Sequence, residues 1–383
     1  MINLIRFWIP NAVSIVFLSL ELPIISFLMI SAPVNQVANY TIAVACLMFA
    51  NSLIYPICPF VIQNNRHPKS FFISASIVLL VFSIFNMLIY FYIEEQETRL
   101  ICYMFSLSLL LIGAKRYLQA CHILSDSIKV ISRSSIYRVI LSVSFCFLLL
   151  NIEFFERKDI SVIFSILLGG CVEVSILFKE FMKINNKNSY KEISVNYSIK
   201  SYMTLIFVSA SYLSTNFILM HILVDDLSMM KYWAIIFTII TVSIYPLLDS
   251  DSIIMKFLKN KDRYIVEFGI VASTICAIFF ILFIFILFNV SNEEYIKNFI
   301  LSPMTIICCI LTPYLWCARS YFRIKYILLE KNTIVILFIL LSFVGCYLAS
   351  YFLQIKSPII LFNFVIILEM LGYLVKSNLI KNS

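Results

Sequence analysis

The chain has 383 residues, of which 62% are hydrophobic and 13% are charged, and its mean hydropathy is +0.97. A soluble domain cannot bury so large an apolar surface, so the composition excludes an ordinary globular protein and predicts a polytopic membrane protein. The net charge of +8 does not indicate nucleic-acid binding here, because membrane proteins concentrate Lys and Arg in the loops on one side of the bilayer.

Apolar runs long enough to cross a bilayer follow one another along almost the whole chain. A helix that spans the hydrocarbon core needs about 20 such residues. The sequence predicts an all-α polytopic membrane protein with twelve transmembrane helices. In chain order the runs lie at 5–30, 37–62, 70–93, 100–124, 134–154, 160–182, 200–224, 228–249, 264–289, 296–320, 332–353 and 358–377.

The charged residues indicate how these helices are oriented. Most of the 29 Lys and Arg residues fall in the connections on the side of both termini, for example Arg133, Lys256, Arg323 and Lys325. The other side carries acidic turns such as the Glu94-Glu95 pair. Because basic loops stay in the cytoplasm, we expect both termini there and a multi-pass location in the cytoplasmic (inner) membrane.

The longest polar connection divides the runs into two sets of six. We expect an N-terminal six-helix bundle at 1–183, a cytoplasmic linker at 184–198 and a C-terminal six-helix bundle at 199–383. Short matches recur in the same order in both halves, for example "SLIYPICPF" with "VSIYPLLDS", and "AKRYLQ" with "ARSYFR". An even number of spans keeps both halves in one orientation, so the pattern predicts a parallel repeat with pseudo-two-fold symmetry.

A glutamate stands inside the first run, in the stretch "SLELPII". A charge at this depth costs about 2.5–3.5 kcal/mol on insertion scales, so Glu21 needs an explanation. At 100° per residue, Asn11, Ser14 and Glu21 fall on one face of the helix, and that face meets protein or water. Glu21 is either an ion-coupling carboxylate that lines a cavity with Asn11 and Ser14, or a neutral acid that hydrogen-bonds neighbouring helices.

The seventh run begins the second half and carries a similar polar face without a carboxylate. Ser209, Tyr212 and Asn216 follow i, i+3, i+7 spacing. They are either further residues lining a cavity or small polar contacts that hold two helices together.

Basic residues lie inside the fourth and fifth runs. Lys115, Arg116 and Arg138 either form a basic site facing the cytoplasm, for a phosphate or carboxylate on the cargo, or extend their charged ends to the interface. The second interpretation is the one the sequence favours. In the sixth and twelfth runs, Glu173 and Glu369 either pair with such cations as a gate or neutralise the lysines that follow them.

Several kinds of functional motif are not found in the sequence. The 11 cysteines form no CxxC pair and no Cys/His cluster with metal-ligand spacing, so no metal site is expected. No phosphate-binding glycine loop, HExxH motif or nucleophile elbow occurs, and no loop is long enough for a catalytic domain. We therefore expect a protein that is not an enzyme and holds no cofactor.

The chain resembles the multidrug/oligosaccharidyl-lipid/polysaccharide (MOP) exporter superfamily. The resemblance is clearest in "LIRFWIPNAVSIVFLSLELPIIS" and in "RYLQACHILSDSIKVISRSSIYRVIL". This superfamily contains the MATE multidrug exporters, the polysaccharide flippases and the progressive-ankylosis-type transporters. The resemblance implies two six-helix bundles around a V-shaped cavity, alternating access, and coupling to H+ or Na+. In several MATE branches an acid in the first helix carries the coupling, and Glu21 is the matching position.

The resemblance leads to an expected function. We expect an ion-coupled efflux antiporter that moves a small molecule or metabolite out of the cytoplasm, works as a monomer in the bilayer and binds no nucleic acid. The alternative in the same superfamily is a flippase for lipid-linked oligosaccharide or polysaccharide cargo. A membrane glycosyltransferase or polymerase, and a channel or scaffold, are the alternatives outside it.

Overall fold

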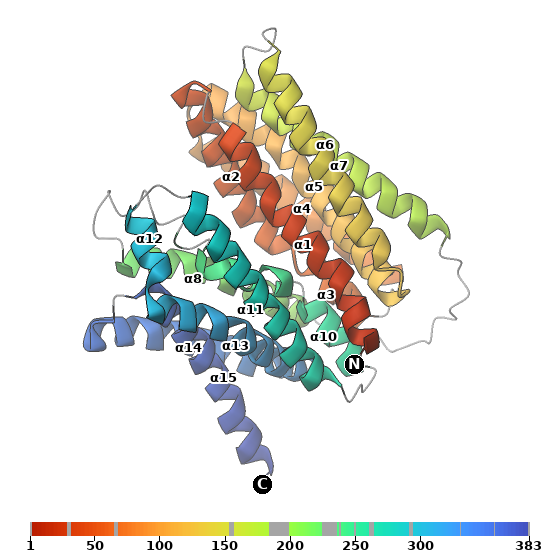
Figure 1. The fold of residues 1–383 in the computed structure, drawn as a ribbon. Coiled ribbons are helices and arrows are strands. Elements are labelled where there is room, and N and C mark those ends of the chain that lie inside the picture. Colours follow the sequence, from red (N-terminus) through yellow and green to blue (C-terminus); the bar gives the residue numbers. More distant parts are fainter. Residues whose placement is uncertain are drawn as a thin grey trace. The chain divides into compact units, whose positions relative to one another are not determined.

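The structure is a computed structural model, and its described part is helical throughout (Figure 1). It describes residues 2–28, 32–64, 68–152, 157–183, 199–223, 236, 239–248, 250–259, 264–290, 294–329, 331–355 and 357–381. These residues separate into two compact units, which we call the N-terminal unit (residues 9–197) and the C-terminal unit (residues 198–383 together with 1–8). The predicted linker, 184–198, lies outside the described residues.

In the N-terminal unit, α5 is the central helix. It packs against α2, α3, α4 and α7, while α6 lies along α7. The helices of this unit are α1 (Ile2–Leu28, from residue 9 onward), α2 (Val34–Ile54), α3 (Ile57–Gln63), α4 (Pro68–Tyr92), α5 (Gln96–Leu124), α6 (Lys129–Asn151) and α7 (Lys158–Lys183).

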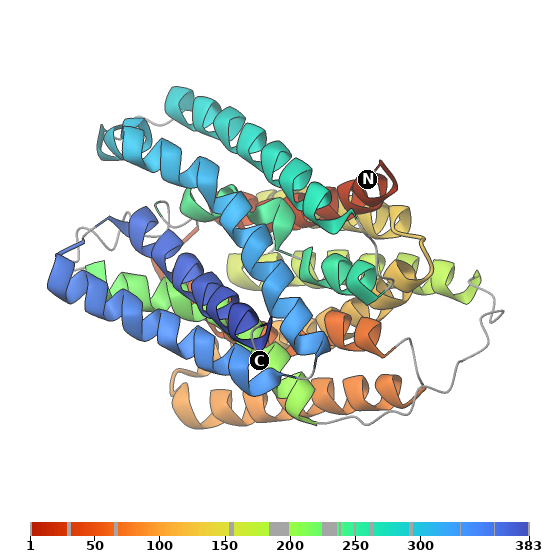
Figure 2. The same ribbon diagram turned by 90° about the horizontal axis from the view of Figure 1, so that it is seen from below.

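The C-terminal unit repeats this packing around α13. That helix contacts α10, α11 and α15, while α14 lies along α15 and α8 (Figures 1 and 2). The described elements are α8 (Ile199–Leu223), the short 3-10 helix η2 (Tyr245–Leu247), α10 (Ser250–Lys259), α11 (Ile265–Val290), α12 (Glu294–Leu301), α13 (Pro303–Leu328), α14 (Asn332–Leu353) and α15 (Pro358–Lys381). Residues 1–8 of α1 also group with this unit, an assignment that the sequence did not predict.

Proline interrupts a helix at corresponding places in the two units. The predicted second run is interrupted at Tyr55-Pro56, between α2 and α3, and the eighth at Tyr245-Pro246, where η2 replaces α-helix. Proline lacks the backbone N–H and its ring clashes with the carbonyl four residues earlier, so a regular α-helix does not continue through it. The tenth run also differs from its predicted bounds, because Pro303 starts α13 and leaves α12 as a separate short helix.

The outer faces of the long helices are apolar, as a bilayer requires. Seven helices in the described ranges are long and apolar enough to cross a membrane, namely α4, α5, α6, α7, α11, α14 and α15. Large apolar side chains remain exposed on them, including Phe91 of α4, Phe285 of α11 and Phe352 of α14. Exposure of this kind is unfavourable in water and favourable against lipid. The chain is thus an all-α multi-pass membrane protein, as predicted.

Candidate functional site

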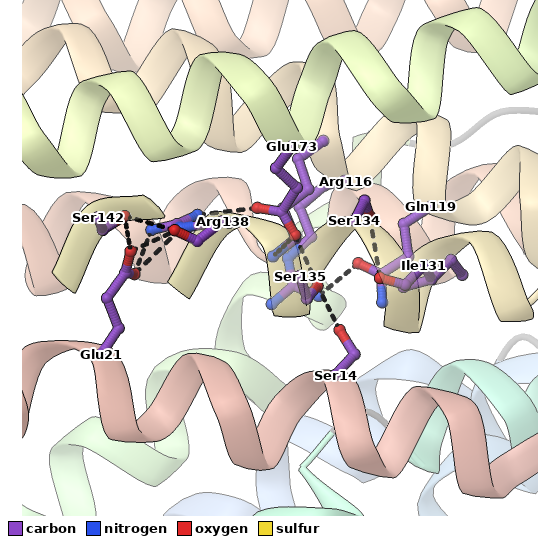
Figure 3. Close-up of polar contacts among 11 residues, drawn as sticks. Ser14, Glu21, Arg116, Gln119, Ile131, Ser134, Ser135, Arg138, Ser142 and Glu173 are labelled. Carbon is purple, nitrogen blue, oxygen red and sulfur yellow. Dashed lines mark hydrogen bonds and ion pairs between the residues drawn. The ribbon is translucent and has the colours of Figure 1, made fainter. Parts of the chain in front are cut away.

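Glu21 of α1 lies in a buried ion pair with α6. Its side chain is 2% exposed, and both of its oxygens accept hydrogen bonds from Arg138 (Figure 3). The Arg138 Nε lies 3.1 Å from Oε1 and 3.0 Å from Oε2, and Nη2 lies 2.7 Å from Oε2. The Ser142 hydroxyl donates a further bond to Oε1 at 2.7 Å. Glu21 therefore fixes α1 to α6 through charge-assisted bonds.

Arg138 extends this contact to α7. Its Nη1 donates to Oε2 of Glu173 at 3.0 Å, and Lys115 Nζ of α5 lies 2.9 Å from Oε1 of the same glutamate. Ser135 of α6 also donates to Glu173 Oε1, at 2.7 Å, and its hydroxyl is 2.6 Å from that of Ser14 on α1 (Figure 3). We call the four charged residues, Glu21, Lys115, Arg138 and Glu173, the ion network.

The ion network is electrically balanced. It contains two carboxylates and two cations, and all four are largely withdrawn from solvent, Arg138 being the most accessible with a side chain that is 15% exposed. Burial of an ion is expensive unless opposite charge and hydrogen bonds replace the water that it loses. Here each carboxylate receives charged donors and a serine hydroxyl, so the network meets that condition.

The local sequence explains how these groups meet. Ser135, Arg138 and Ser142 follow i, i+3, i+7 spacing and therefore share one face of α6. Gly169 of α7 lies against that face, and a Cβ there would collide with the Ser142 hydroxyl and press on the Arg138 carbonyl. The glycine thus permits the close approach of α6 and α7 that brings Arg138 to Glu173.

The C-terminal unit buries a glutamate in a simpler arrangement. Arg323 of α13 binds Glu369 of α15 in a bidentate pair, with Nε–Oε1 at 2.8 Å and Nη2–Oε2 at 2.6 Å. The Tyr373 hydroxyl donates to Oε1 at 3.0 Å. One turn earlier on α13, Arg319 is 4% exposed and its guanidinium stacks 3.8 Å above the ring of Trp316.

Several predicted residues lie elsewhere than the sequence suggested. Lys115 and Arg138 do not extend to an interface. Their side chains lie between packed helices, largely withdrawn from solvent, and are paired with carboxylates. Arg323, assigned to a connection, lies inside α13, which continues to Leu328, beyond the predicted end of the tenth run at residue 320. Arg116 takes no part in the ion network. Its guanidinium stacks 3.6 Å from the ring centre of Tyr55 and donates to Gln119.

Of the residues predicted to line a cavity, the structure describes two side chains. Ser14 is buried and bonded to Ser135, so the predicted face of α1 meets α6 in this structure. The Ser209 hydroxyl donates to carbonyls of its own helix, α8, at 3.0 and 3.2 Å. The side chains of Asn11, Tyr212 and Asn216 lie outside the described part.

Three residues that take part in these buried contacts were not predicted from the sequence. Ser135 and Ser142 were not singled out, although their spacing around Arg138 inside an apolar run was a readable signal. Arg323 was missed because the predicted helix was too short. In the part of the chain that the structure describes, no three His, Cys, Asp or Glu side chains gather as a metal site would require.

Solved structures resemble this chain over nearly its whole length. A MATE transporter in an outward-facing conformation superposes with a TM-score of 0.71 at 13% identity, covering 97% of this chain and 93% of the other. A mutant of the Vibrio cholerae MATE transporter VcmN gives 0.71 at 12% identity, with 100% and 97% coverage. This chain has the MATE fold.

A third structure, the MATE transporter ClbM in complex with Rb+, gives a TM-score of 0.67 at 15% identity, covering 98% of this chain and 94% of the other. No protein-family model matches the chain, and no curated protein matches its sequence. MATE transporters are all-α proteins of twelve helices, so the predicted fold class is confirmed, and the resemblance to MATE transporters holds for the fold.

Proposed function

We propose that this chain is an ion-coupled secondary exporter that moves a small molecule or metabolite out of the cytoplasm by alternating access. It would lie in the cytoplasmic membrane with both termini in the cytoplasm and act as a monomer. The MATE fold supports transport, and the observation that carries the coupling is the charge-balanced network around Glu21. Glu21 would be the residue that takes up and releases the coupling ion.

The state of Glu21 controls how firmly α1 is held. Protonation of Glu21 removes the negative charge that accepts three hydrogen bonds from Arg138. The ion network then carries one excess positive charge. The α1 helix then keeps the neutral contact between Ser14 and Ser135. Such a change loosens α1 from α6 and supplies a chemical trigger for a conformational step.

The course of α1 gives this trigger a mechanical effect. Its residues 1–8 group with the C-terminal unit and its remainder with the N-terminal unit. Trp8 is buried in the C-terminal unit, where its indole N–H donates to the carbonyl of Pro246 at 3.2 Å. Pro10 follows at the change of unit, and proline permits a helix to bend. We propose that ion exchange at Glu21 bends α1 at Pro10 during the transport cycle.

The geometry favours a proton as the coupling ion. Both oxygens of Glu21 already accept bonds from N–H and O–H groups, and Arg138 and Lys115 place positive charge nearby. A sodium ion would need several free oxygen ligands and would be repelled by these cations, whereas a proton needs one lone pair. The preference for a proton over a sodium ion follows from the contacts of Glu21.

Reconstituted transport tests the proposal. The probes are ethidium and radiolabelled succinate, each assayed in proteoliposomes with an imposed pH or Na+ gradient. We expect transport of one probe to follow the pH gradient and to lose that dependence in Glu21→Gln. The control is Glu267→Gln, the same substitution at an exposed glutamate of α11. Unchanged gradient dependence in Glu21→Gln would show that this residue is not the coupling site.

One observation favours the flippase as a second candidate. An apolar groove of about 410 Å³ lies between α1 and α6, and its apolar lining suits a lipid chain. Its lining residues are Ile24, Leu28, Val143, Ser144, Phe147 and Leu148. If the cargo is lipid-linked, Val143→Trp should fill this groove and slow translocation of a fluorescent polyprenyl-phosphate sugar in vesicles, while ethidium transport stays unchanged.

A further inference from the structure

The C-terminal unit contains a buried arginine, Arg319, that forms no ion pair with any residue the structure describes. Arg319 is 4% exposed, and its Nε forms no hydrogen bond in the described part of the chain. The nearby carboxylate of Glu369 is occupied by Arg323 in a bidentate pair. Arg323 thus takes both oxygens of Glu369, and Arg319 forms no ion pair among the described residues.

The surroundings of Arg319 compensate its charge only in part. The Trp316 ring, 3.8 Å from the guanidinium, supplies a cation–π contact. Asp251 of α10 attracts Arg319 electrostatically but forms no ion pair with it. The neighbouring Ser320 hydroxyl is also buried and without a hydrogen-bond partner in the residues described. The Arg319 Nε and the Ser320 hydroxyl thus belong to consecutive residues of α13, and neither forms a hydrogen bond among the described residues.

The comparison with the N-terminal unit shows that this is a specific difference. In the aligned stretches "AKRY" and "ARSY", Lys115 corresponds to Arg319. Lys115 binds Glu173 at 2.9 Å, whereas the equivalent glutamate in the second half is taken by Arg323. The helix α8, which corresponds to α1, has no Asp or Glu in its sequence that could replace Glu21.

We propose that Arg319, with the adjacent Ser320 and the Trp316 ring, binds an oxyanion, either a carboxylate or a phosphate group, carried by the transported molecule. The proposal rests on the proposed function for the statement that the anion is cargo. A guanidinium stacked on an aromatic ring keeps its N–H edges for in-plane hydrogen bonds, which is the geometry that carboxylate and phosphate oxygens accept. The anion would accept the hydrogen bond that the Arg319 Nε does not form within the described residues.

Fluorescence of Trp316 provides a direct binding test. The chain has three tryptophans, so the double variant Trp8→Phe, Trp233→Phe leaves Trp316 as the sole indole reporter. This protein, in phosphatidylcholine nanodiscs, is titrated with succinate and with inorganic phosphate. We expect a saturable change in emission that weakens about tenfold or more in Arg319→Gln. Choline and glucose serve as cationic and neutral controls.

Matched variants separate binding at Arg319 from general charge effects. Lys325→Gln removes the same charge from an exposed position of α13 and should leave the titration unchanged. Asp251→Asn removes the competing negative charge and should tighten binding. Size-exclusion profiles establish that each variant remains folded before it is titrated.

The source of the anion is resolved by changing the lipid. If soluble anions produce the signal, the cargo is a free organic acid or phosphate compound. If nanodiscs containing a polyprenyl phosphate produce it and soluble anions do not, the cargo is lipid-linked. No Arg319-dependent signal in either arm overturns the proposal. Because binding is measured without a gradient, this failure is distinguishable from failure of ion coupling at Glu21.

Discussion

The two units solve the same problem, a glutamate buried in a membrane helix, in different ways. In the N-terminal unit Glu173 meets Arg138 of α6 and Lys115 of α5, and Arg138 continues to Glu21 of α1. In the C-terminal unit Glu369 is bound by Arg323 of α13, and among the described side chains its partners include none from α8. The first arrangement connects four helices, whereas the second joins two.

The helix that supplies the arginine accounts for this difference. At the position corresponding to Arg138, 200 residues later, α14 carries Phe338, whose ring packs edge-on against Tyr373 with centroids 5.2 Å apart. An apolar contact therefore replaces the ionic one between the paired helices. In the N-terminal unit, Arg138 connects Glu173 to Glu21 of α1. In the C-terminal unit, Arg323 and Glu369 bind each other, and Arg319 forms no ion pair among the described residues.

The largest expected effect comes from removing one arginine from each unit. Arg138→Gln leaves Glu21 buried without its cation, and loss of one partner of a buried pair costs about 3–5 kcal/mol. Arg319→Gln removes a buried cation that forms no ion pair among the described residues, so we expect unchanged or higher stability. Thermal unfolding in detergent measures both, and equal destabilisation of the two variants would contradict the balance that we describe.

A double variant sharpens this result. Adding Glu21→Gln to Arg138→Gln removes the charge that was left unpaired, so part of the lost stability should return. If the two substitutions simply add, Glu21 and Arg138 do not stabilise one another, and the hydrogen bonds between them contribute nothing to the folded state.

An intermediate effect is expected at the glycine that brings α6 to α7. Gly169→Ala places a methyl group against Ser142 and the Arg138 carbonyl, and overpacking of this kind costs about 1–3 kcal/mol. The control is Gly269→Ala in α11, where the nearest atom to the added Cβ is the Cys317 Cβ at an ordinary 3.7 Å. A harmless Gly169→Ala would mean that the close approach is not required.

The smallest effect is expected from a pair of serines 200 residues apart. Ser142→Ala removes one hydrogen bond to the Glu21 carboxylate, which contributes roughly 1 kcal/mol. Ser342 of α14 donates only to the carbonyl of Ile339 in its own helix, so Ser342→Ala should change the unfolding temperature very little. Equal effects at the two serines would remove the distinction between the units at this position.

The sequence predicted the features that are marked by residues unfavourable in a membrane helix. A glutamate in an apolar run, polar residues on one helix face and Tyr-Pro pairs in both halves are each unfavourable in a lipid-facing helix, and each proved to mark a contact or a break. Glu21, Ser14 and Tyr55-Pro56 are such cases.

The sequence could not show which charges meet. Glu173 could be assigned to Lys115 or to the lysines after it, because both lie within a few turns along the chain. The choice depends on how closely α6 approaches α7, which Gly169 decides. Arg323 was placed in a loop because hydropathy ends a helix where charges begin, whereas its pairing with Glu369 compensates the burial of its charge inside α13.

The unpaired charge of Arg319 also has a consequence for membrane voltage. Moving one elementary charge across a potential of 100 mV changes the free energy by about 2.3 kcal/mol. If Glu21 takes in one proton for each monovalent anion that leaves from Arg319, two charges move inward in effect. A membrane that is negative inside then contributes about 4.6 kcal/mol per 100 mV to each cycle, so voltage drives export even where the pH gradient is absent.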